Sequence, residues 1–441
     1  MSSVDSTATM PASAADNLSP IYRKIAVRLI PILMLLWVMA WIDRVNVSFS
    51  KLQMMDELRF SDTVYGLGAG IFFIGYLIFE VPSNLLLQRI GARGTIARIA
   101  IGWGATCALM SLAATPAAFY ALRFLLGAFE AGFFPGVILY LTLWFPSDRR
   151  AKVFGIFMSS VALSGVFGGP LAGFIMSALH TYLGLSGWQW LFILEGEPTM
   201  LIGVFCLFYL TNRLAEAHWL SPAERAAVAA DLERDHVLLG SREHQFGSVI
   251  RDRRLWVFTA IYFCVIIANA TVAFWGPSII REAGVADIPT IGWIVSGASL
   301  LGSATMILNG FIADRTGRPL ALCVLSLLVA SAALGTMAAF LHSSSVITIV
   351  AFAFALAGAY GTIPVFWQMP NRLFAGTAAA GGIAVINSFG NLGGFLAPYG
   401  LGITASQTGD VAGGLIAVSL ITLAAAVGIV AIRRFFAAGA V

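Results

Sequence analysis

Four ionisable side chains stand inside runs of apolar residues, and their types could do chemistry. Asp43 and Arg44 are adjacent near the end of the first apolar run, and Arg123 and Glu130 lie seven residues apart in the fourth. Arginine offers a planar fork of donors that matches a carboxylate. A buried carboxyl can take up and release a proton, because burial disfavours its charged form. These residues therefore indicate a site that binds an organic anion and exchanges a proton.

The spacing of Arg123 and Glu130 places them on one helical face. Seven helical residues turn through about 700° and rise about 10 Å. A charge inside a membrane span costs roughly 2.5–3.5 kcal/mol on insertion scales, so such residues usually face water or a partner. The pair either lines a cavity, with Glu130 titrating, or forms a structural ion pair that holds spans one and four. Because function is the default for intramembrane ionisable residues, we favour the cavity.

The composition decides what kind of chain must position these residues. The 441 residues are 59% hydrophobic and 11% charged, whereas soluble proteins carry about 25% charged residues. Such a chain cannot cover a water-facing surface, and its recurring apolar runs predict a polytopic α-helical membrane protein. The four cysteines fall inside these runs without metal-ligand spacing, so we expect buried packing residues and no metal site. They are Cys107, Cys206, Cys264 and Cys323.

Twelve apolar runs predict an all-α fold of twelve transmembrane helices. One long polar segment, 212–254, leaves six runs on each side, and its Ser221-Pro222-Ala223-Glu224 predicts the capping box of an amphipathic helix. We expect a tail over 1–24, a six-helix bundle over 25–211, the linker over 212–254, a second bundle over 255–435 and a tail over 436–441. The runs cover about 25–49, 64–88, 95–114, 117–141, 153–178, 189–211, 255–280, 289–313, 319–341, 346–368, 377–401 and 413–435.

Lysine and arginine are distributed unevenly between the two ends of these runs. If the N-terminus is cytoplasmic, 21 of the 26 fall in inner loops and tails, and the outer loops hold only Lys51, Arg59 and Arg281. This bias predicts cytoplasmic N- and C-termini. We expect a multi-pass protein of the inner (cytoplasmic) membrane, with no removable signal peptide.

The two halves of the chain repeat each other. Gly91 and Gly317, in similar segments after spans two and eight, are 226 residues apart, and Gly169 and Gly394 are 225 apart. Two anchors with nearly the same offset indicate a duplicated six-helix unit. Two pseudo-symmetric bundles fit alternating access, in which one bundle rocks against the other about a site near the membrane midplane.

Longer motifs add a family resemblance that covers about Arg28 to Arg434. The segment Gly310-x-x-Ala-Asp314-Arg315-x-Gly317-Arg318 resembles the signature loop of the major facilitator superfamily, although the first-half copy has Asn84 and Gln88 where Gly and Asp are usual. Other motifs resemble its anion:cation symporter branch, which includes bacterial galactonate, tartrate, phthalate and 4-hydroxyphenylacetate transporters and the vesicular glutamate transporters. These motifs are Asp43-Arg44-Val-Asn46, Phe79-Glu80-Val-Pro82-Ser83-Asn84-Leu, Arg123-x-x-x-Gly127-x-x-Glu130-Ala-Gly132 and Ile386-Asn387-Ser388-x-Gly390-Asn391-Leu-Gly393-Gly394.

The resemblance implies roles for single residues. In the galactonate symporters of that branch, positions matching Asp43 and Glu130 take the proton, and one matching Arg44 contacts the substrate. In the vesicular glutamate transporters, arginines matching Arg44 and Arg123 line the cavity; a third has no match here, and Asn269 stands on that span instead. The expected substrate-binding residues are Arg44, Tyr76, Arg123, Asn269, Trp367, Asn387 and Asn391, and the expected proton-coupling residues are Asp43 and Glu130. The alternatives are aromatic packing for Tyr76 and Trp367 and interhelical hydrogen bonding for the asparagines.

Further residues are expected to shape or gate the site. Gly165, Gly169 and Gly173 form a small-xxx-small ladder that lets helices approach closely at a rocking interface. Glu195 and Glu197 lie two residues apart in span six and cannot share a face, so only one can face a cavity. Structural or gating roles are expected for Glu80, Arg89, Asp314, Arg315 and Arg318, the last three forming an inner latch.

The sequence therefore predicts a secondary active transporter that imports a small organic carboxylate with protons. Aromatic residues expected around the cavity could stack on an aromatic acid or on a sugar-acid face; they include Trp41, Phe274, Trp275, Phe366 and Trp367. Trp41 stands where the galactonate symporters have Tyr, which removes a hydroxyl donor and favours an aromatic acid such as phthalate or hydroxyphenylacetate. A hydroxy acid such as tartrate stays open. The alternatives are a sugar-acid (aldonate or hexuronate) proton symporter, an anion exchanger or a uniporter. A polytopic membrane enzyme is a remote alternative, because the histidines lie in or near loops and form no cluster. We expect H⁺ as the coupling ion, no cofactor, no nucleic-acid partner, and a monomer in the lipid bilayer.

Overall fold

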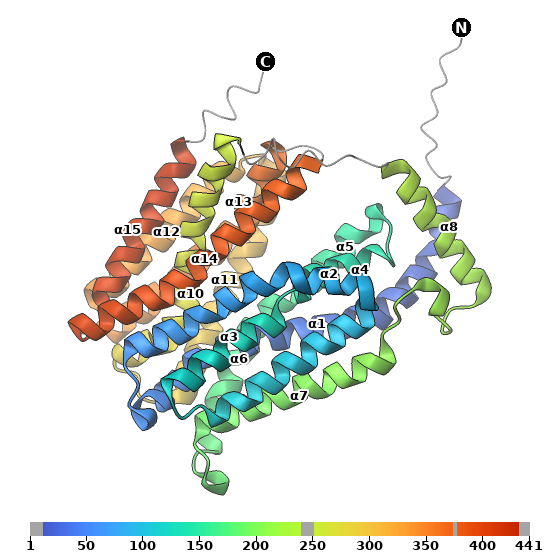
Figure 1. Cartoon of the computed structure of the whole chain (residues 1–441). Coiled ribbons are helices and arrows are strands. Elements are labelled where there is room, and N and C mark those ends of the chain that lie inside the picture. Colours follow the sequence, from blue (N-terminus) through green and yellow to red (C-terminus); the bar gives the residue numbers. More distant parts are fainter. Residues whose placement is uncertain (1–11, 240–250, 374–376, 432–441) are drawn as a thin grey trace.

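A computed structural model describes residues 12–239, 251–373 and 377–431, and nearly all of them are helical (Figure 1). Four predicted parts lie partly or wholly outside the described residues: the N-terminal tail as far as residue 11, the linker over 240–250, the second bundle over 374–376 and 432–435, and the C-terminal tail over 436–441. Eleven of the described helical segments are long and apolar enough to cross a membrane. With the 32-residue helix Thr377–Thr408, they account for the twelve predicted spans.

Six spans form the N-terminal half. Its second and third spans are two helical segments, together labelled α2, that are separated by the non-helical backbone of Gly91. Its fourth span is divided into α3 and α4 at Gly132. The helices are α1 (Ala12–Leu58), α2 (Asp62–Leu109), α3 (Pro116–Glu130), α4 (Phe133–Thr142), α5 (Ser147–Met158), α6 (Ser160–Ala178) and α7 (Gly187–Tyr209), with short 3-10 turns η1 (Met110–Leu112) and η2 (Tyr182–Gly184).

The linker contains the turn η3 (Leu214–Glu216) and the helix α8 (Pro222–Leu239). Glu224 Oε2 accepts from the backbone N–H of Ser221 at 2.7 Å, and Ser221 Oγ accepts from that of Glu224 at 3.1 Å, so the predicted capping box is present. The C-terminal half consists of α10 (Arg253–Glu282), α11 (Ile288–Thr316), α12 (Pro319–Phe340), α13 (Ser345–Leu373), α14 (Thr377–Thr408) and α15 (Ala412–Ala431).

The first span is longer than its apolar run. The sequence predicts a span over 25–49 followed by a loop that holds Lys51, but α1 continues to Leu58 and Lys51 lies inside it, 8% exposed. Hydropathy marks where the hydrocarbon layer ends, and a helix can continue beyond that layer with charged residues. The placement of Lys51 in an outer loop is therefore wrong.

The two glycines that anchor the repeat have the same backbone requirement. Gly91 has φ 81° and Gly317 has φ 64°, and both stand where one helical segment ends on the same side of the molecule. Residues with a side chain rarely adopt such positive φ values, although ψ differs between the two, 167° at Gly91 and 18° at Gly317. The duplicated spacing thus marks two helix ends that favour glycine, one in each half.

The two halves pack through helices that contain glycine. We call the end of the molecule that carries α8 the linker side and the opposite end the far side; the bundles diverge towards the linker side (Figure 1). Near the far side α6 packs on α11, and a Cβ added to Gly169 would lie 2.5 Å from the carbonyl oxygen of Gly292. On the other flank α2 packs on α14, where a Cβ added to Gly394 would lie 2.5 Å from the Phe73 ring. Such approach is possible only where a side chain is absent.

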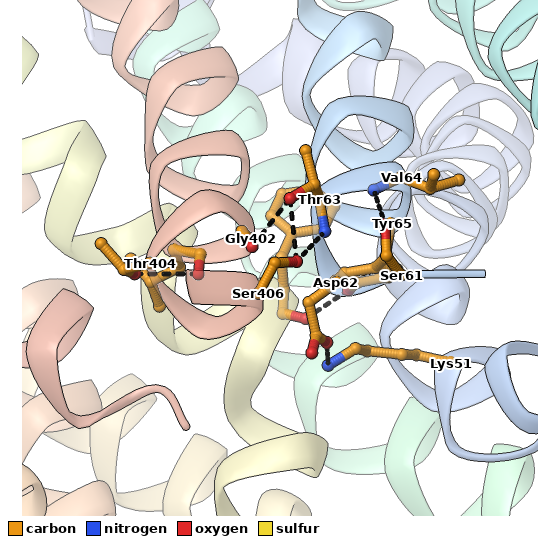
Figure 2. A network of polar contacts seen from close by, with 11 residues as sticks. Lys51, Ser61, Asp62, Thr63, Val64, Tyr65, Gly402, Thr404 and Ser406 are labelled. Carbon is orange, nitrogen blue, oxygen red and sulfur yellow. Dashed lines mark hydrogen bonds and ion pairs between the residues drawn. The ribbon is translucent and has the colours of Figure 1, made fainter. Parts of the chain in front are cut away.

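Polar contacts close the far side. Thr63 Oγ1 donates to the Gly402 carbonyl at 3.2 Å and to Ser406 Oγ at 2.8 Å, and Lys51 pairs with Asp62 at 2.8 Å (Figure 2). We call the residues that meet here the far-side layer; they are Lys51, Asp62, Thr63, Tyr65, Phe274, Trp275, Gly402 and Ser406. Within the described ranges, the hydrogen bonds that join the two halves involve only the parts of the helices nearer the far side. The structure is therefore closed at that side.

Candidate functional site

The site is built around an ion pair between Arg44 on α1 and Glu130 on α3. Arg44 Nη2 donates to Glu130 Oε1, and the side chain of Arg44 is 13% exposed whereas that of Glu130 is fully buried. Three aromatic rings surround the guanidinium: its carbon lies 4.8 Å from the ring centroid of Trp41, 5.2 Å from that of Phe72 and 5.5 Å from that of Tyr76. Arg44 Nε and Glu130 Oε2 have no hydrogen-bond partner. The pair thus keeps polar atoms that a ligand or a proton can engage.

The local fold explains why Glu130 reaches this position. Gly127 brings α3 against α2, because any side chain there would strike the Phe72 carbonyl. Glu130 is the last residue of α3, and Gly132 then turns the chain with φ 84° and lies against the side chain of Ser83. The break in the span leaves the carboxyl at a helix end, where irregular backbone is tolerated because protein surrounds it.

Arg123 is more deeply buried than the cavity-facing position that the sequence predicts. Its side chain is 0% exposed and donates to the backbone carbonyls of Gly68 at 3.2 Å and Ala69 at 3.3 Å. It makes no ion pair with Glu130, but its guanidinium carbon lies 5.2 Å from the Phe72 ring, the same distance as that of Arg44. Arg123 therefore adds positive charge beside the pair without facing a cavity in this conformation.

Asp43 points away from Arg44, although the two are adjacent. The Asp43 carboxyl is 0% exposed, and Oδ2 accepts from Trp103 Nε1 at 2.7 Å and from Thr199 Oγ1 at 3.2 Å. Cys107 Sγ lies 3.4 Å from Oδ1. Successive helical residues differ by about 100° in direction, so one residue faces α3 and the other faces α7.

The C-terminal half contributes neutral polar and aromatic groups. The amide of Asn269 donates to the carbonyls of Val265 at 2.9 Å and Ala359 at 3.3 Å. Gly394 on α14 contacts Phe73 on α2. Asn391 lies one turn from Gly394 towards the linker side, and Tyr76 lies one turn from Phe73 in the same direction. All predicted substrate-binding residues other than Arg123 are half-buried: Arg44, Tyr76, Asn269, Trp367, Asn387 and Asn391.

Several predicted cavity aromatics lie elsewhere. Phe274 and Trp275 belong to the far-side layer: the hydroxyl of Tyr65 donates to the Phe274 carbonyl, and Lys51 Nζ lies 3.9 Å from the Trp275 ring centroid. Phe366 is buried and stacks on Tyr262 at 5.0 Å. Trp41 and Trp367 are half-buried, so their rings can meet a ligand.

The predicted gating residues divide between two regions. The linker-side residues Arg89, Asp314, Arg315 and Arg318 are exposed, and Asp314 accepts from Gln368 Nε2 at 3.1 Å within its own half. Glu80 is half-buried on α2. The glycine ladder lies at the contact between the halves: Gly165 faces Ser299, Gly169 faces Gly292 and Gly173 faces Pro289.

Sequence reasoning missed that Trp103, Cys107 and Thr199 hold the Asp43 carboxyl. Trp103 and Cys107 are four residues apart on α2, and Glu195 and Thr199 are four apart on α7, so each pair shares a helical face. This spacing is the signal that could have found them. It does not say which neighbouring helix the face meets.

Comparison with known proteins defines the class. The Major Facilitator Superfamily model matches residues 32–398. A putative tartrate transporter of Agrobacterium vitis is 42% identical over 402 residues, 91% of this chain and 92% of the relative. A putative metabolite transport protein, NicT, of Pseudomonas putida is 41% identical over 389 residues, 88% and 89% of the two chains. A solved bacterial homologue of the human lysosomal transporter Spinster, described as inward-facing and occupied, has a TM-score of 0.73 at 16% identity and covers 94% of this chain and 97% of its own.

The chain therefore belongs to the major facilitator superfamily, a family of multi-pass membrane transporters. Its similarity to transporters of organic anions, over nearly the whole length of both chains, supports the same broad class for this protein. A membrane enzyme is the alternative that this finding removes.

Proposed function

We propose that the protein imports a small organic carboxylate together with protons across the inner membrane. The observation that supports this most directly is the Arg44–Glu130 ion pair on the linker side of the closed layer, in which the side chain of Arg44 stays 13% exposed. Arg44 is the guanidinium that a substrate carboxylate can reach, and in this conformation a protein carboxylate holds it.

The pair couples the proton to the substrate. A substrate carboxylate and the Glu130 carboxylate compete for the same donors of Arg44, because a guanidinium fork binds one carboxylate well. A proton on Glu130 removes its negative charge and frees Arg44 for the substrate. Substrate binding and proton binding then favour each other, and linkage makes this coupling reciprocal.

The charge distribution supports the orientation. Among the described residues, most lysines and arginines outside the spans lie on the linker side, which by the positive-inside rule supports a cytoplasmic position for that side. The far-side layer then closes the site from outside, and the structure is inward-facing. In the outward-facing state the same pair would meet the external, more acidic side, where Glu130 takes its proton.

Two substrate classes are supported by separate observations. The relatives named as putative tartrate transporters, 42% and 41% identical, favour a hydroxy acid such as tartrate. The half-buried rings of Trp41 and Trp367 favour an aromatic carboxylate such as phthalate or 4-hydroxyphenylacetate, because a ring can stack on them. We place tartrate first, since the likeness to those relatives extends over nine-tenths of the chain.

Uptake into liposomes tests the proposal. With the membrane potential held at zero and the outside acidic, purified protein should accumulate labelled tartrate or one of the two aromatic acids above its outside concentration. Glu130→Gln should accumulate less than wild type, because neutral glutamine cannot carry the proton.

The other outcomes separate the alternatives. A wild-type protein that only equalises the concentrations would be a uniporter, and one that moves the carboxylate only against an internal anion would be an exchanger. Galactonate uptake in place of the others would indicate a sugar-acid symporter. Full accumulation by Glu130→Gln would remove Glu130 from the coupling step.

A further inference from the structure

A second carboxyl cluster lies behind α1, away from the Arg44–Glu130 pair. Glu195 on α7 is 1% exposed, and its Oε2 accepts from Asn46 Nδ2 at 2.9 Å. Asn46 Nδ2 also lies 3.4 Å from Cys107 Sγ, which in turn lies 3.4 Å from Asp43 Oδ1. Asn46 and Cys107 thus join Glu195 and Asp43 into one cluster.

This cluster holds two carboxyls and no cation. Arg44 is engaged by Glu130, and Arg123 donates to backbone carbonyls of α2. Among the described residues, no lysine or arginine pairs with Asp43 or Glu195. Two negative charges in a low-dielectric site repel each other, so a close pair of carboxyls retains one proton between them.

The two carboxyls differ in access. All three contacts of Asp43 come from its own half, through Trp103, Cys107 and Thr199. Glu195 Oε1 is buried and has no partner. Glu195 also lines a cavity of about 60 Å³ between the halves, which is room enough for water.

The cavity walls come from both halves. Trp41, Asn46 and Glu195 line it from α1 and α7, and Leu356 and Tyr360 line it from α13. A rocking motion of one half against the other must therefore change what Glu195 faces. Besides the two carboxyls, the titratable groups that interact with the cluster or line its cavity are Cys107 on α2, Glu130 on α3 and Tyr360 on α13.

We propose that Asp43 and Glu195 share one coupling proton and that Glu195 is the member that exchanges it with the cavity. The proton moves from hydronium onto Glu195 Oε1, leaving water, and returns to water when the cavity opens to the other side; no other bond changes. This inference rests on the proposed proton coupling, and it assigns a role to a residue of span six to which the sequence gives none.

Infrared difference spectra of the substrate-free protein, recorded across a pH step, test the shared proton without transport. Wild type should show the C=O stretch of a protonated buried carboxylic acid that disappears as pH rises. E195Q and D43N should each remove or shift that same band, and E195D should restore it. E197Q is the matched control, because Glu197 lies two residues away on the exposed face of α7.

The outcomes are distinct. Spectra of E195Q that match those of wild type would overturn the proposal, and so would two bands removed separately by E195Q and D43N. Glutamine can still accept from Asn46, so a purely structural role for Glu195 predicts unchanged spectra in E195Q. If wild type shows the band but no accumulation under a proton gradient, the proposed symport fails while the shared proton stands.

Discussion

The two halves share one fold but differ in what they bury. In the described residues, every charged side chain that is buried lies in the N-terminal half, whereas the buried polar side chains of the C-terminal half are serines, threonines and Asn309. The buried charged residues are Asp43, Lys51, Arg123, Glu130 and Glu195. Because buried charge is costly and persists mainly where it is used, the difference supports the proposal that the first half carries the proton and anion chemistry.

The duplication allows corresponding positions of the two halves to be compared. The 226-residue offset of the repeated glycines relates Asp43 to Asn269 and Glu130 to Leu356. Asn269 satisfies its amide with two backbone carbonyls, and Leu356 lines the cavity between the halves. A carboxyl in one copy thus corresponds to a neutral or apolar group in the other. The N-terminal half carries the titratable groups, and the C-terminal half can shape the space that the substrate occupies.

The largest effect is expected at Arg44. Arg44→Ala should weaken carboxylate binding by about 30-fold to a few thousand-fold, because removing one partner of a buried charge pair costs about 2–5 kcal/mol. Isothermal titration of the purified protein measures the change. Arg44→Lys should recover only part of the affinity, since lysine keeps the charge but lacks the fork.

The melting temperature shows whether Arg44→Ala loses binding only because it loses stability. Arg44→Ala also leaves Glu130 buried without a partner, so the melting temperature should fall, and adding Glu130→Gln should raise it again without restoring binding. Undiminished affinity in Arg44→Ala would show that Arg44 does not recognise the substrate. It would contradict the assignment of anion binding to the N-terminal half.

A smaller effect is expected where the halves meet. Lys51→Met removes a cation that lies on the Trp275 ring across the far-side layer, a contact worth about 0.5–2 kcal/mol. The outward-open population should rise by about 2- to 30-fold, which distances between spin labels on the two halves at the far side can measure. Lys152→Met, at an exposed position of α5, is the matched control. Equal populations in both variants would show that the layer does not depend on Lys51.

The smallest effect is expected in the neutral half. Asn391→Ala should raise KM by about 2- to 12-fold, because it removes one proposed hydrogen bond to the substrate, worth about 0.5–1.5 kcal/mol. The number of protons moved per carboxylate should not change. A change in that number, measured from parallel proton and substrate fluxes, would place proton chemistry in the C-terminal half as well.

Sequence reasoning reached the spans, the capping box of α8 and the repeat, because these depend on local pattern. Hydropathy finds apolar runs, Ser221 and Glu224 are three residues apart, and the positive φ at Gly91 and Gly317 favours glycine. Each is decided within a few residues of the chain.

The partners of the charged residues could not be predicted in the same way. Glu130 pairs with Arg44, 86 residues away, rather than with Arg123 on its own face. Periodicity gives the direction of a side chain on its helix, but the neighbour in that direction depends on how helices pack. The same limit hid the contacts of Asp43 with Trp103 and Thr199.

The central claim is that a proton on Glu130 frees Arg44 for the substrate carboxylate. Calorimetric titration of the purified protein with tartrate, or with whichever carboxylate it transports, in two buffers of different ionisation enthalpy measures proton uptake on binding. Wild type should take up protons as the carboxylate binds, and Glu130→Gln should lose the uptake assigned to Glu130 while still binding. Binding to wild type without proton uptake, at an affinity independent of pH, would contradict the account.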